Sequence, residues 1–175
     1  YDLLVIGFGK AGKTLAATLG NEGKRVAVVE ESSEMYGGTC INIGCIPTKT
    51  LIVAADNKKE FKEAKVTRDT VVSKLNAKNF AMLDNNPNID VYTASAKFVS
   101  NKVVEISIDD ETKQLEGDVV VINTGAKNNV LPIPGLTTSK NVYDSTQFQK
   151  LESTPKTLGI IGGGNIGIEF ANLLI

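Results

Sequence analysis

The segment Gly7-Phe8-Gly9-Lys10-Ala11-Gly12 decides the fold of this 175-residue chain. It follows a short apolar run, Leu3-Leu4-Val5-Ile6, and precedes a stretch of helical spacing that extends to about Asn21. A second apolar run covers residues 25–29 and is closed by Glu30. The pattern predicts a β-strand, an α-helix and a second parallel β-strand, with a G-x-G-x-x-G loop at the first turn. The apolar face expected for the helix is formed by Ala11, Leu15, Ala16 and Leu19.

Each part of this loop suits a dinucleotide. Gly7 makes the turn after the strand, and Gly9 lets the backbone approach a pyrophosphate. Gly12 lets the helix pack closely on the strand. Glu30 follows the last glycine by about 20 residues and is placed to accept hydrogen bonds from ribose hydroxyls. The pattern therefore predicts nucleotide binding, and the alternative is a glycine-rich helix start in an unrelated α/β protein.

The two cysteines of the chain, Cys40 and Cys45, lie in the segment Gly37-Gly38-Thr39-Cys40-Ile41-Asn42-Ile43-Gly44-Cys45-Ile46-Pro47-Thr48-Lys49. Proline favours the first turn of a helix, so we expect Cys45 at or near a helix N-terminus. The N–H groups and the dipole there favour a thiolate. Two thiols on a tight turn indicate a redox-active disulfide, although a static disulfide or two buried thiols stay open. A zinc site is disfavoured, because the chain has no histidine and no second cysteine pair.

The next region is predicted to be helical. The helix that begins near Cys45 continues over residues 48–55, and the charged residues 58–65 are expected to form a solvated face. A further helix is predicted to start at Thr67 as its N-cap and to run to Asp84. Its apolar stripe is expected to contain Val71, Leu75, Lys78 and Met82, and the run Asn85-Asn86-Pro87-Asn88 ends it.

From residue 89 to residue 122 the hydrophobic period changes to two. Antiparallel strands are predicted over residues 89–92, 96–99, 103–108 and 114–116, with turns at Asn101 and at Asp109-Asp110-Glu111. This is a β-meander inserted before a parallel strand, Asp118-Val119-Val120-Val121-Ile122, which we expect to be buried on both faces. That strand ends at Asn123-Thr124-Gly125, where open α/β sheets bind ligands.

The opening pattern then returns. After an extended connection at residues 131–135, a short helix over 145–151 and a linker over 153–156, a strand is predicted at Thr157-Leu158-Gly159-Ile160-Ile161. The second G-x-G-x-x-G, Gly162-Gly163-Gly164-Asn165-Ile166-Gly167, follows, with a helix from Ile168. The fold class predicted is α/β: a Rossmann-like fold with an inserted antiparallel meander, then the truncated start of a second Rossmann-like fold. We therefore expect the chain to be a fragment of a longer protein.

Composition excludes several function classes. The formal net charge is −1, which argues against nucleic-acid binding and against a polybasic membrane binder. No apolar run reaches the roughly 20 residues of a spanning helix, and no signal peptide is visible. We expect a soluble cytoplasmic protein that has neither nucleic acid nor membrane as a partner.

The order of these motifs resembles the class I pyridine nucleotide–disulfide oxidoreductases, which include glutathione reductase, lipoamide dehydrogenase and mercuric reductase. The resemblance covers the whole chain. Residues 7–15 and 35–51 are most similar to one bacterial branch, the reactive-chlorine-resistance flavoproteins, also described as hypothiocyanous acid reductases. The resemblance implies an FAD-binding domain over residues 1–153 and the beginning of an NAD(P)-binding domain over 154–175.

The activity implied by the resemblance is electron transfer from NADH or NADPH through FAD to a Cys40–Cys45 disulfide. A small oxidant such as hypothiocyanous acid, a reactive chlorine product or a metal ion would then be reduced by a homodimer. Lipoamide, glutathione or mercuric ion are alternative substrates, and a flavin-binding redox sensor without turnover is an alternative of another class.

The resemblance also implies residue roles. Cys45 would face the flavin, Cys40 would be the interchange thiol that meets the substrate, and Lys49 would contact the flavin near its reactive nitrogen. Glu169 matches the acid that pairs with that lysine. FAD would be bound by Gly7, Gly9, Lys10, Ala11, Gly12, Glu30, Gly38, Thr39, Lys49, Thr124 and Gly125, and NAD(P) by Gly162, Gly164 and Gly167. No metal site is expected.

Two residues depart from the family pattern. Asn165 stands where many members have a tyrosine, and Asn123 stands where an alanine is common. The acid–base histidine of the family comes from a C-terminal domain of the partner subunit, and this chain contains no histidine. The resemblance therefore implies that the fragment itself does not turn over.

Overall fold

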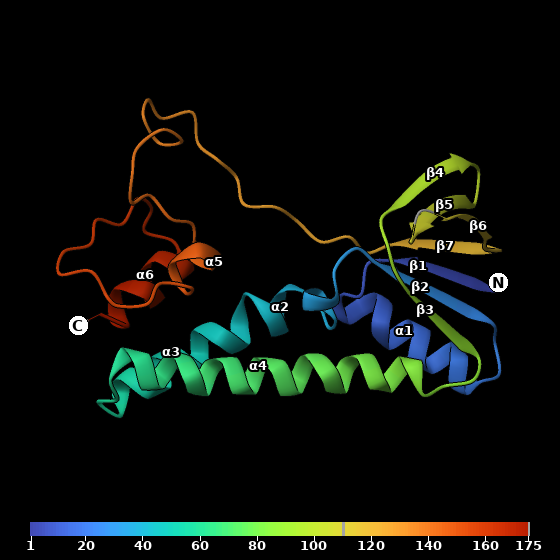
Figure 1. Cartoon of the computed structure of the whole chain (residues 1–175), viewed down its shortest axis with the longest axis horizontal. Coiled ribbons are helices and arrows are strands. Elements are labelled where there is room, and N and C mark those ends of the chain that lie inside the picture. The colour runs from blue at the N-terminus through green and yellow to red at the C-terminus, as the bar shows by residue number, and fades with distance from the viewer. Residues whose placement is uncertain (110, 175) are drawn as a thin grey trace. The chain divides into compact units, whose positions relative to one another are not determined.

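The computed structural model describes residues 1–109 and 111–174 (Figure 1). A parallel sheet forms the centre of its first part, with strand order β3-β2-β1-β7. The four strands are β1 (Leu3–Ile6), β2 (Val26–Glu30), β3 (Ile89–Thr93) and β7 (Val119–Ile122). Helix α1 (Lys10–Asn21) connects β1 to β2. The β-α-β unit predicted around the first glycine loop is therefore confirmed.

A second, antiparallel sheet has the strand order β4-β5-β6. Its strands are β4 (Ala96–Ser100), β5 (Val103–Ile108) and β6 (Glu111–Glu116). The predicted meander is confirmed for these three strands, but the prediction that residues 89–92 form its first antiparallel strand is wrong. That segment is β3 and pairs parallel with β2, because a period of two specifies the faces of a strand but not the direction of its partner. Of the predicted turn, Asp110 lies outside the described residues and Glu111 begins β6.

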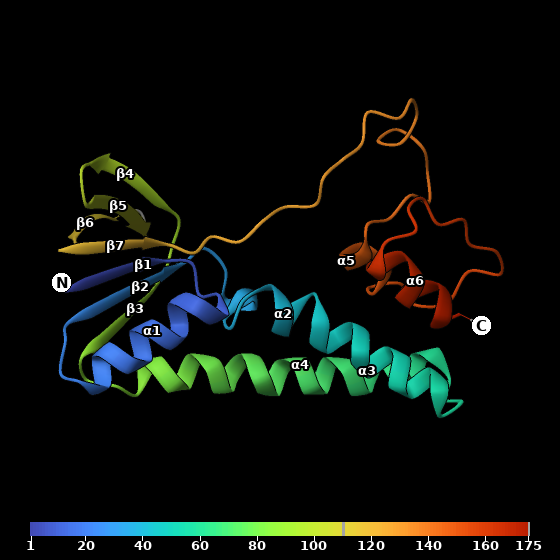
Figure 2. The same cartoon turned by 180° about the vertical axis from the view of Figure 1, so that it is seen from behind.

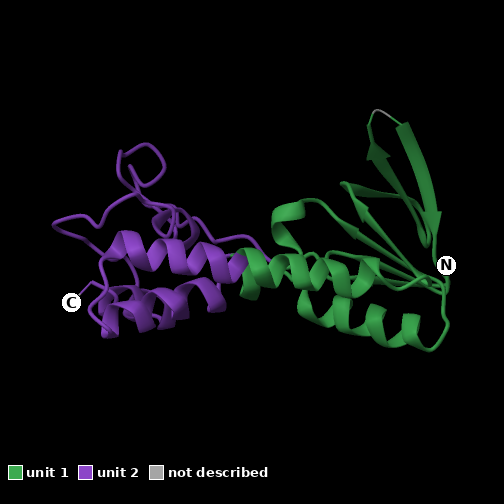
Figure 3. Ribbon diagram, turned by 60° about the horizontal axis from the view of Figure 1, so that its bottom comes forward, with its two compact units in different colours: residues 1–42, 73–125 green, residues 43–72, 126–175 purple. Residues whose placement is uncertain are grey.

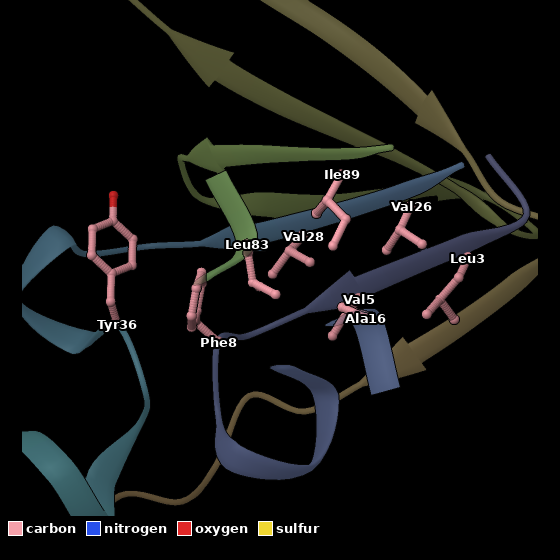
Figure 4. Packing of buried hydrophobic residues seen from close by; sticks show 9 residues of the cluster. All are labelled: Leu3, Val5, Phe8, Ala16, Val26, Val28, Tyr36, Leu83 and Ile89. Carbon is pink, nitrogen blue, oxygen red and sulfur yellow. The ribbon is translucent and has the colours of Figure 1, made fainter. Parts of the chain in front are cut away.

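The parallel sheet is covered on both faces (Figures 1 and 2). On one face, side chains of the sheet pack with α1 and with the C-terminal half of α4 (Phe61–Asp84), and Figure 4 shows the nine buried side chains of this cluster. This cluster comprises Leu3, Val5, Phe8, Ala16, Val26, Val28, Tyr36, Leu83 and Ile89. On the other face, Leu4, Ala27, Val29 and Ala94 pack with Val104, Ile106 and Leu115 of the meander. Burial on both faces explains why β1 and β2 are continuous apolar runs.

Helix α1 buries a different face from the one predicted. Its buried residues are Gly12, Ala16 and Gly20, whereas Leu15 is 39% exposed and Ala11 is exposed. The reason is close packing: a Cβ on Gly20 would lie 2.6 Å from the Ile89 side chain. Small residues therefore face the sheet.

Helix α4 starts earlier than predicted and is continuous through Thr67. The Thr67 hydroxyl donates to the carbonyl of Glu63 at 3.1 Å, so Thr67 is an interior residue and the predicted N-cap is wrong. The predicted stripe is also displaced, because Met82 is 46% exposed while Leu83 is fully buried. A serine or threonine inside a helix can bond the carbonyl four residues back, and this removes its value as a start signal here.

Strand β7 lies at an edge of the described sheet. Val119 is 55% exposed and Ile122 is 67% exposed, so the expectation of burial on both faces is wrong for the strand ends. Val120 and Val121 are partly buried, one against each cluster. The middle of β7 is therefore covered and its two ends are not.

The chain divides into two compact units (Figure 3): residues 1–42 with 73–125, and residues 43–72 with 126–175. The second unit contains α3 (Cys45–Asp56), α5 (Ser145–Phe148), α6 (Asn165–Asn172) and the N-terminal half of α4. Its core comprises Leu51, Ala54, Ala64, Phe148, Phe170 and Leu173. The predicted domain boundary between residues 153 and 154 stays a prediction.

The second β-α prediction is only half right. Helix α6 begins at Asn165, three residues before the predicted start, but the described residues 157–161 form no strand. Leu158, Ile160 and Ile161 are exposed by 38%, 42% and 68%. A strand needs a partner for its backbone N–H and C=O groups, and the described part of this unit offers none. Helix α5 is likewise shorter than predicted.

None of the helices within residues 1–109 and 111–174 combines the length and the apolar character needed to cross a bilayer.

We predict that Leu4→Ala lowers the free energy of unfolding by about 2–5 kcal/mol, because Leu4 is fully buried between the parallel sheet and the meander. Val119→Ala in the edge strand is the control and should change it by about 0.5 kcal/mol or less. Urea denaturation followed by circular dichroism measures both variants. Equal losses would contradict the packing described for β1.

Candidate functional site

The first glycine loop lies at the carboxyl end of β1. Gly7 has a φ of +100°, and its N–H donates to the carbonyl of Val29 at 2.7 Å. Gly9 is the N-cap of α1, and within the described chain no side chain caps this helix start. Its first N–H groups are therefore available to a ligand, as at helix N-termini that bind phosphates. Lys10 and Ala11 form the exposed first turn.

Glu30 holds this loop from the end of β2. One carboxylate oxygen accepts from the backbone N–H of Phe8 at 2.8 Å, and the other accepts from Ser32 at 3.3 Å. The carboxylate borders a cavity of about 180 Å³, lined by residues from the ends of β1 and β2, from Ala94–Ala96 and from Thr124. The structure thus brings together the glycine loop and the acid that the sequence indicated.

Asn123 holds the loop from the opposite side, at the end of β7. Its backbone N–H donates to the carbonyl of Ile6 at 2.7 Å, and its side-chain Nδ2 donates to the carbonyl of Gly7 at 3.3 Å. A Cβ on Gly9 or Gly12 would lie 2.7 Å or 2.8 Å from this same nitrogen. Sequence reasoning noted Asn123 only as a departure. The signal available was a polar side chain directly after an apolar parallel strand.

The cysteine segment meets the glycine loop through backbone alone. Gly38 has a φ of +79°, and a Cβ there would lie 2.7 Å from the Cα of Gly9. Helix α2 (Thr39–Asn42) follows directly, with Cys40 in its only turn and partly buried. A Cβ on Gly125 would lie 3.8 Å from the Thr39 hydroxyl oxygen. Gly38 therefore lies against the glycine loop and Gly125 lies near Thr39, while their part in FAD binding stays a prediction.

Three aromatic rings, those of Phe8, Tyr36 and Phe80, pack in a row that begins in the glycine loop. The ring centroids of Phe8 and Tyr36 are 5.1 Å apart, and those of Tyr36 and Phe80 are 4.6 Å apart. The Tyr36 hydroxyl shares a hydrogen bond with the Thr93 hydroxyl. Sequence reasoning gave none of these residues a role. The aromatic residue between the first two glycines was the signal that could have found the group.

Lys13 and Asn79 form a polar contact beside this group. The Lys13 ammonium donates to the side-chain oxygen of Asn79, which is 6% exposed. Burial, and to a lesser degree the nearby charge of Lys10, lower the pKa of Lys13. A Cβ on Gly37 would lie 3.0 Å from the Asn79 side chain, so the contact borders the turn that leads to the cysteines.

The second unit holds the other predicted redox residues. Cys45 is the first residue of α3, with Gly44 as the N-cap, which confirms the predicted helix start. Lys49 lies one turn further and forms an ion pair with Glu169 of α6. The Lys49 side chain is 59% exposed and the Glu169 side chain 34%. The pair that the resemblance implied is therefore formed.

The second glycine motif forms a helix start in this same unit. Gly162 has a φ of +111°, and Gly164 is the N-cap of α6. Gly167 approaches the carbonyl of Gly162 so closely that a Cβ would clash with it. Around Gly163 and Gly164, no atom of the described residues lies within 4 Å of a Cβ.

Cys40 belongs to the first unit and Cys45 to the second. Their pairing as a disulfide stays a prediction. No group of three or more histidine, cysteine, aspartate or glutamate side chains suited to a metal ion occurs within residues 1–109 and 111–174.

The comparison with protein families agrees with this geometry. The family model described as pyridine nucleotide-disulphide oxidoreductase matches residues 1–175. The chain belongs to this family. The predicted family and the predicted α/β class are thereby confirmed.

Among members of the family, the probable pyridine nucleotide-disulfide oxidoreductase RclA of Escherichia coli (strain K12) is 50% identical over 173 residues. The match covers 99% of this chain and 39% of RclA. A dihydrolipoyl dehydrogenase of Chlamydia pneumoniae is 33% identical, with 99% and 40% covered. A mercuric reductase of Lysinibacillus sphaericus is 31% identical, with 99% and 34% covered. The chain thus spans about two fifths or less of the length of these relatives.

A solved structure gives the same result. The Cu(II) complex of the HOCl-induced flavoprotein disulfide reductase RclA from Escherichia coli superposes with a TM-score of 0.96 at 50% identity. The match covers 99% of this chain and 39% of that one. This chain therefore shares its fold, a parallel sheet with an antiparallel insertion, with a flavoprotein disulfide reductase.

We predict that Gly38→Ala destabilises the protein more than Gly23→Ala. Both glycines have a positive φ, +79° and +83°, so both variants carry a left-handed penalty of about 1–2 kcal/mol. A Cβ at Gly23 meets no described atom within 4 Å, whereas at Gly38 it would clash with Gly9. The clash should add about 1–3 kcal/mol in urea denaturation. Indistinguishable losses would mean that the backbone contact is absent.

Proposed function

We propose that this chain is the N-terminal part of a flavoprotein disulfide reductase. The whole protein would carry electrons from NADH or NADPH through FAD to a Cys40–Cys45 disulfide and then to a small oxidant. The observation that carries the proposal is Cys45 at the N-terminus of α3, one turn before a lysine held by Glu169. The predicted homodimer and cytoplasmic location form part of the proposal.

The residues of the first unit fit FAD. The start of α1 at Gly9 carries no acidic residue in its first turn and, among the described residues, no side-chain cap, which suits a diphosphate. Glu30 borders the cavity and suits a ribose. Lys10, Ala11, Gly12, Gly38, Thr39, Thr124 and Gly125 complete the proposed set. FAD, when bound, would supply two-electron chemistry between the nicotinamide and the disulfide.

The residues of the second unit fit the thiol chemistry. Cys45 is exposed at the start of α3, and a helix N-terminus is a common place for a reactive cysteine. Lys49 brings a positive charge to the same end of the helix, and Glu169 fixes the direction of its ammonium. Gly162, Gly164 and Gly167 are the residues proposed for NADH or NADPH.

The thiol balance of the proposed reaction is simple. Two electrons and two protons convert the Cys40–Cys45 disulfide into two thiols. With hypothiocyanous acid, the Cys40 thiolate attacks the sulfur and hydroxide leaves; attack by Cys45 on the Cys40 sulfur of this adduct then closes the disulfide and releases thiocyanate.

The substrate we propose is a small oxidant, namely hypothiocyanous acid, a reactive chlorine product or a metal ion. Support comes from RclA of Escherichia coli, an HOCl-induced flavoprotein disulfide reductase that was solved as a Cu(II) complex. Lipoamide, glutathione or mercuric ion reduction is a second candidate, because dihydrolipoyl dehydrogenases and mercuric reductases match at 30–33% identity. A sensor without turnover is less favoured, since a sensor needs no second glycine motif.

The test counts thiols in the full-length protein purified with FAD. Anaerobic addition of NADH or NADPH should expose two new alkylatable thiols, identified by peptide mass spectrometry as Cys40 and Cys45. The same addition to Cys45→Ser should expose none. Appearance of thiols elsewhere, or of none in the wild type, would refute the proposed disulfide.

We predict that Glu30→Ala weakens FAD binding by about 1–3 kcal/mol, because the variant loses hydrogen bonds to the ribose and to the Phe8 and Ser32 N–H groups. The matched control is Glu34→Ala, an exposed acid on the 3₁₀ turn Ser33–Met35. Fluorescence titration of the apoprotein with FAD measures both. An unchanged affinity for Glu30→Ala would remove Glu30 from the site.

A further inference from the structure

Gln149 connects two distant parts of the second unit. It caps the C-terminal end of α5 and is 2% exposed. Its side-chain Nε2 donates to the carbonyl of Ser145 at 3.1 Å and to the carbonyl of Ile43 at 3.2 Å. Ser145 belongs to the same short helix, but Ile43 lies two residues before Cys45. The amide therefore joins α5 to the backbone that enters the cysteine helix.

Helix α5, which carries Gln149 at its end, is held by a capping box and by core packing. Asp144 and Gln147 form a reciprocal capping box, with hydrogen bonds of 2.7 Å and 3.0 Å. Phe148, the neighbour of Gln149, packs edge-to-face on Phe170 with ring centroids 5.4 Å apart. Both rings lie in the same core cluster as Leu51 of α3. The amide donor is thus fixed relative to α3 itself.

The backbone that Gln149 holds follows Asn42, the side chain of which donates to the carbonyls of Tyr36 and Gly38, and precedes the glycine N-cap of α3. Gly44 caps α3 with a φ of −114° and a ψ of −107°, and it has no side chain with which to hold the turn. The carbonyl of Gly44 accepts from Thr48 at 3.2 Å, which fixes the helix side of the turn. The bond from Gln149 to Ile43 fixes the other side.

Packing alone does not explain an amide at this position. The side-chain oxygen of Gln149 is buried and has no hydrogen-bond partner among the described residues. A buried acceptor without a partner is destabilising, and an apolar side chain of the same length would avoid that penalty. An apolar side chain could not reproduce the two hydrogen bonds that Nε2 donates. Of these two, only the bond to Ile43 reaches a residue outside α5.

We propose that Gln149 is a positioning residue for Cys45. By holding the Ile43 carbonyl it fixes the turn at Gly44, and so keeps the Cys45 sulfur at the N-terminus of α3, where a thiolate is favoured. This inference rests on the proposed function, in which Cys45 reacts as a thiolate. The charged groups on α3 and α6 are Lys49 and Glu169, which are paired with each other, and Asp56 at the far end of α3; all three are unchanged in every variant below.

The experiment measures the alkylation rate of Cys45 by iodoacetamide in the full-length, FAD-containing protein after reduction with dithiothreitol. Peptide mass spectrometry isolates the Cys45 signal over a range of pH. Gln149→Met keeps the length of the side chain and removes the donor. The midpoint of its alkylation profile should lie at a higher pH than that of the wild type.

The matched control is Gln147→Met, the same substitution on the same helix. Gln147 is exposed and stabilises the α5 cap without touching Ile43. An unaltered profile in Gln147→Met together with a shifted one in Gln149→Met supports the positioning role. If both variants shift equally, loosening of α5 explains the effect and the inference is wrong.

A profile of Gln149→Met identical to the wild type also overturns the inference. Should Gln149→Met fail to fold, Gln149→Asn replaces it, because this shorter amide can still bond within α5 but is drawn back from Ile43; the same shift is expected. If the wild type consumes no NAD(P)H with any oxidant, the proposed function fails. The alkylation profiles still decide the role of Gln149 in that case, since they require no turnover.

Discussion

The contact between Gly9 and Gly38 is the constraint on which the arrangement of the first unit depends. At this point the two backbones approach so closely that no side chain fits between them, since a Cβ on Gly38 would lie 2.7 Å from the Cα of Gly9. Gly9 begins α1, and Gly38 is followed at once by Thr39 and Cys40. A single contact without side chains therefore ties the glycine loop to the cysteine segment. In the sequence the two motifs are separate signals, whereas in the structure each limits where the other can lie.

The strand order explains how the glycine loop is held. Because β1 lies between β2 and β7, the last residue of β2 and the first residue after β7 flank the loop that follows β1. Glu30 accepts from the loop on one side, and Asn123 donates to it on the other. One partner is an acceptor of a backbone N–H and the other a donor to a backbone carbonyl, so both hydrogen-bonding directions of the loop are used. Among the described residues no side chain caps the first N–H groups of α1, which leaves them for an anionic ligand.

The sequence predicted correctly those elements that are specified by residues close together in the chain. The run from Leu3 to Glu30 could be assigned because the strand, glycine loop, helix and acid each have their own signal within a few residues. The direction of β3 could not be assigned, since its partner β2 lies about 60 residues earlier and a period of two is the same in parallel and antiparallel strands. The helix through Thr67 was misjudged because a threonine hydroxyl serves equally well as a cap or as a donor to the preceding turn.

Long-range polar contacts escaped sequence reasoning for the same reason. Asn123, Asn79 and Gln149 act through partners 66 to 116 positions away or through the space that they fill beside glycines, and nothing in their immediate neighbours signals this. The Lys49–Glu169 pair was anticipated, but only through resemblance to a family, because the two residues are 120 positions apart.

Stability does not explain why the Lys49–Glu169 pair is present. An ion pair with its lysine 59% exposed adds about 0–1 kcal/mol to stability, which is too little to account for its presence. Its position one turn after Cys45 is a better explanation, because the pair holds a cation one helical turn from the cysteine on which the proposed chemistry depends.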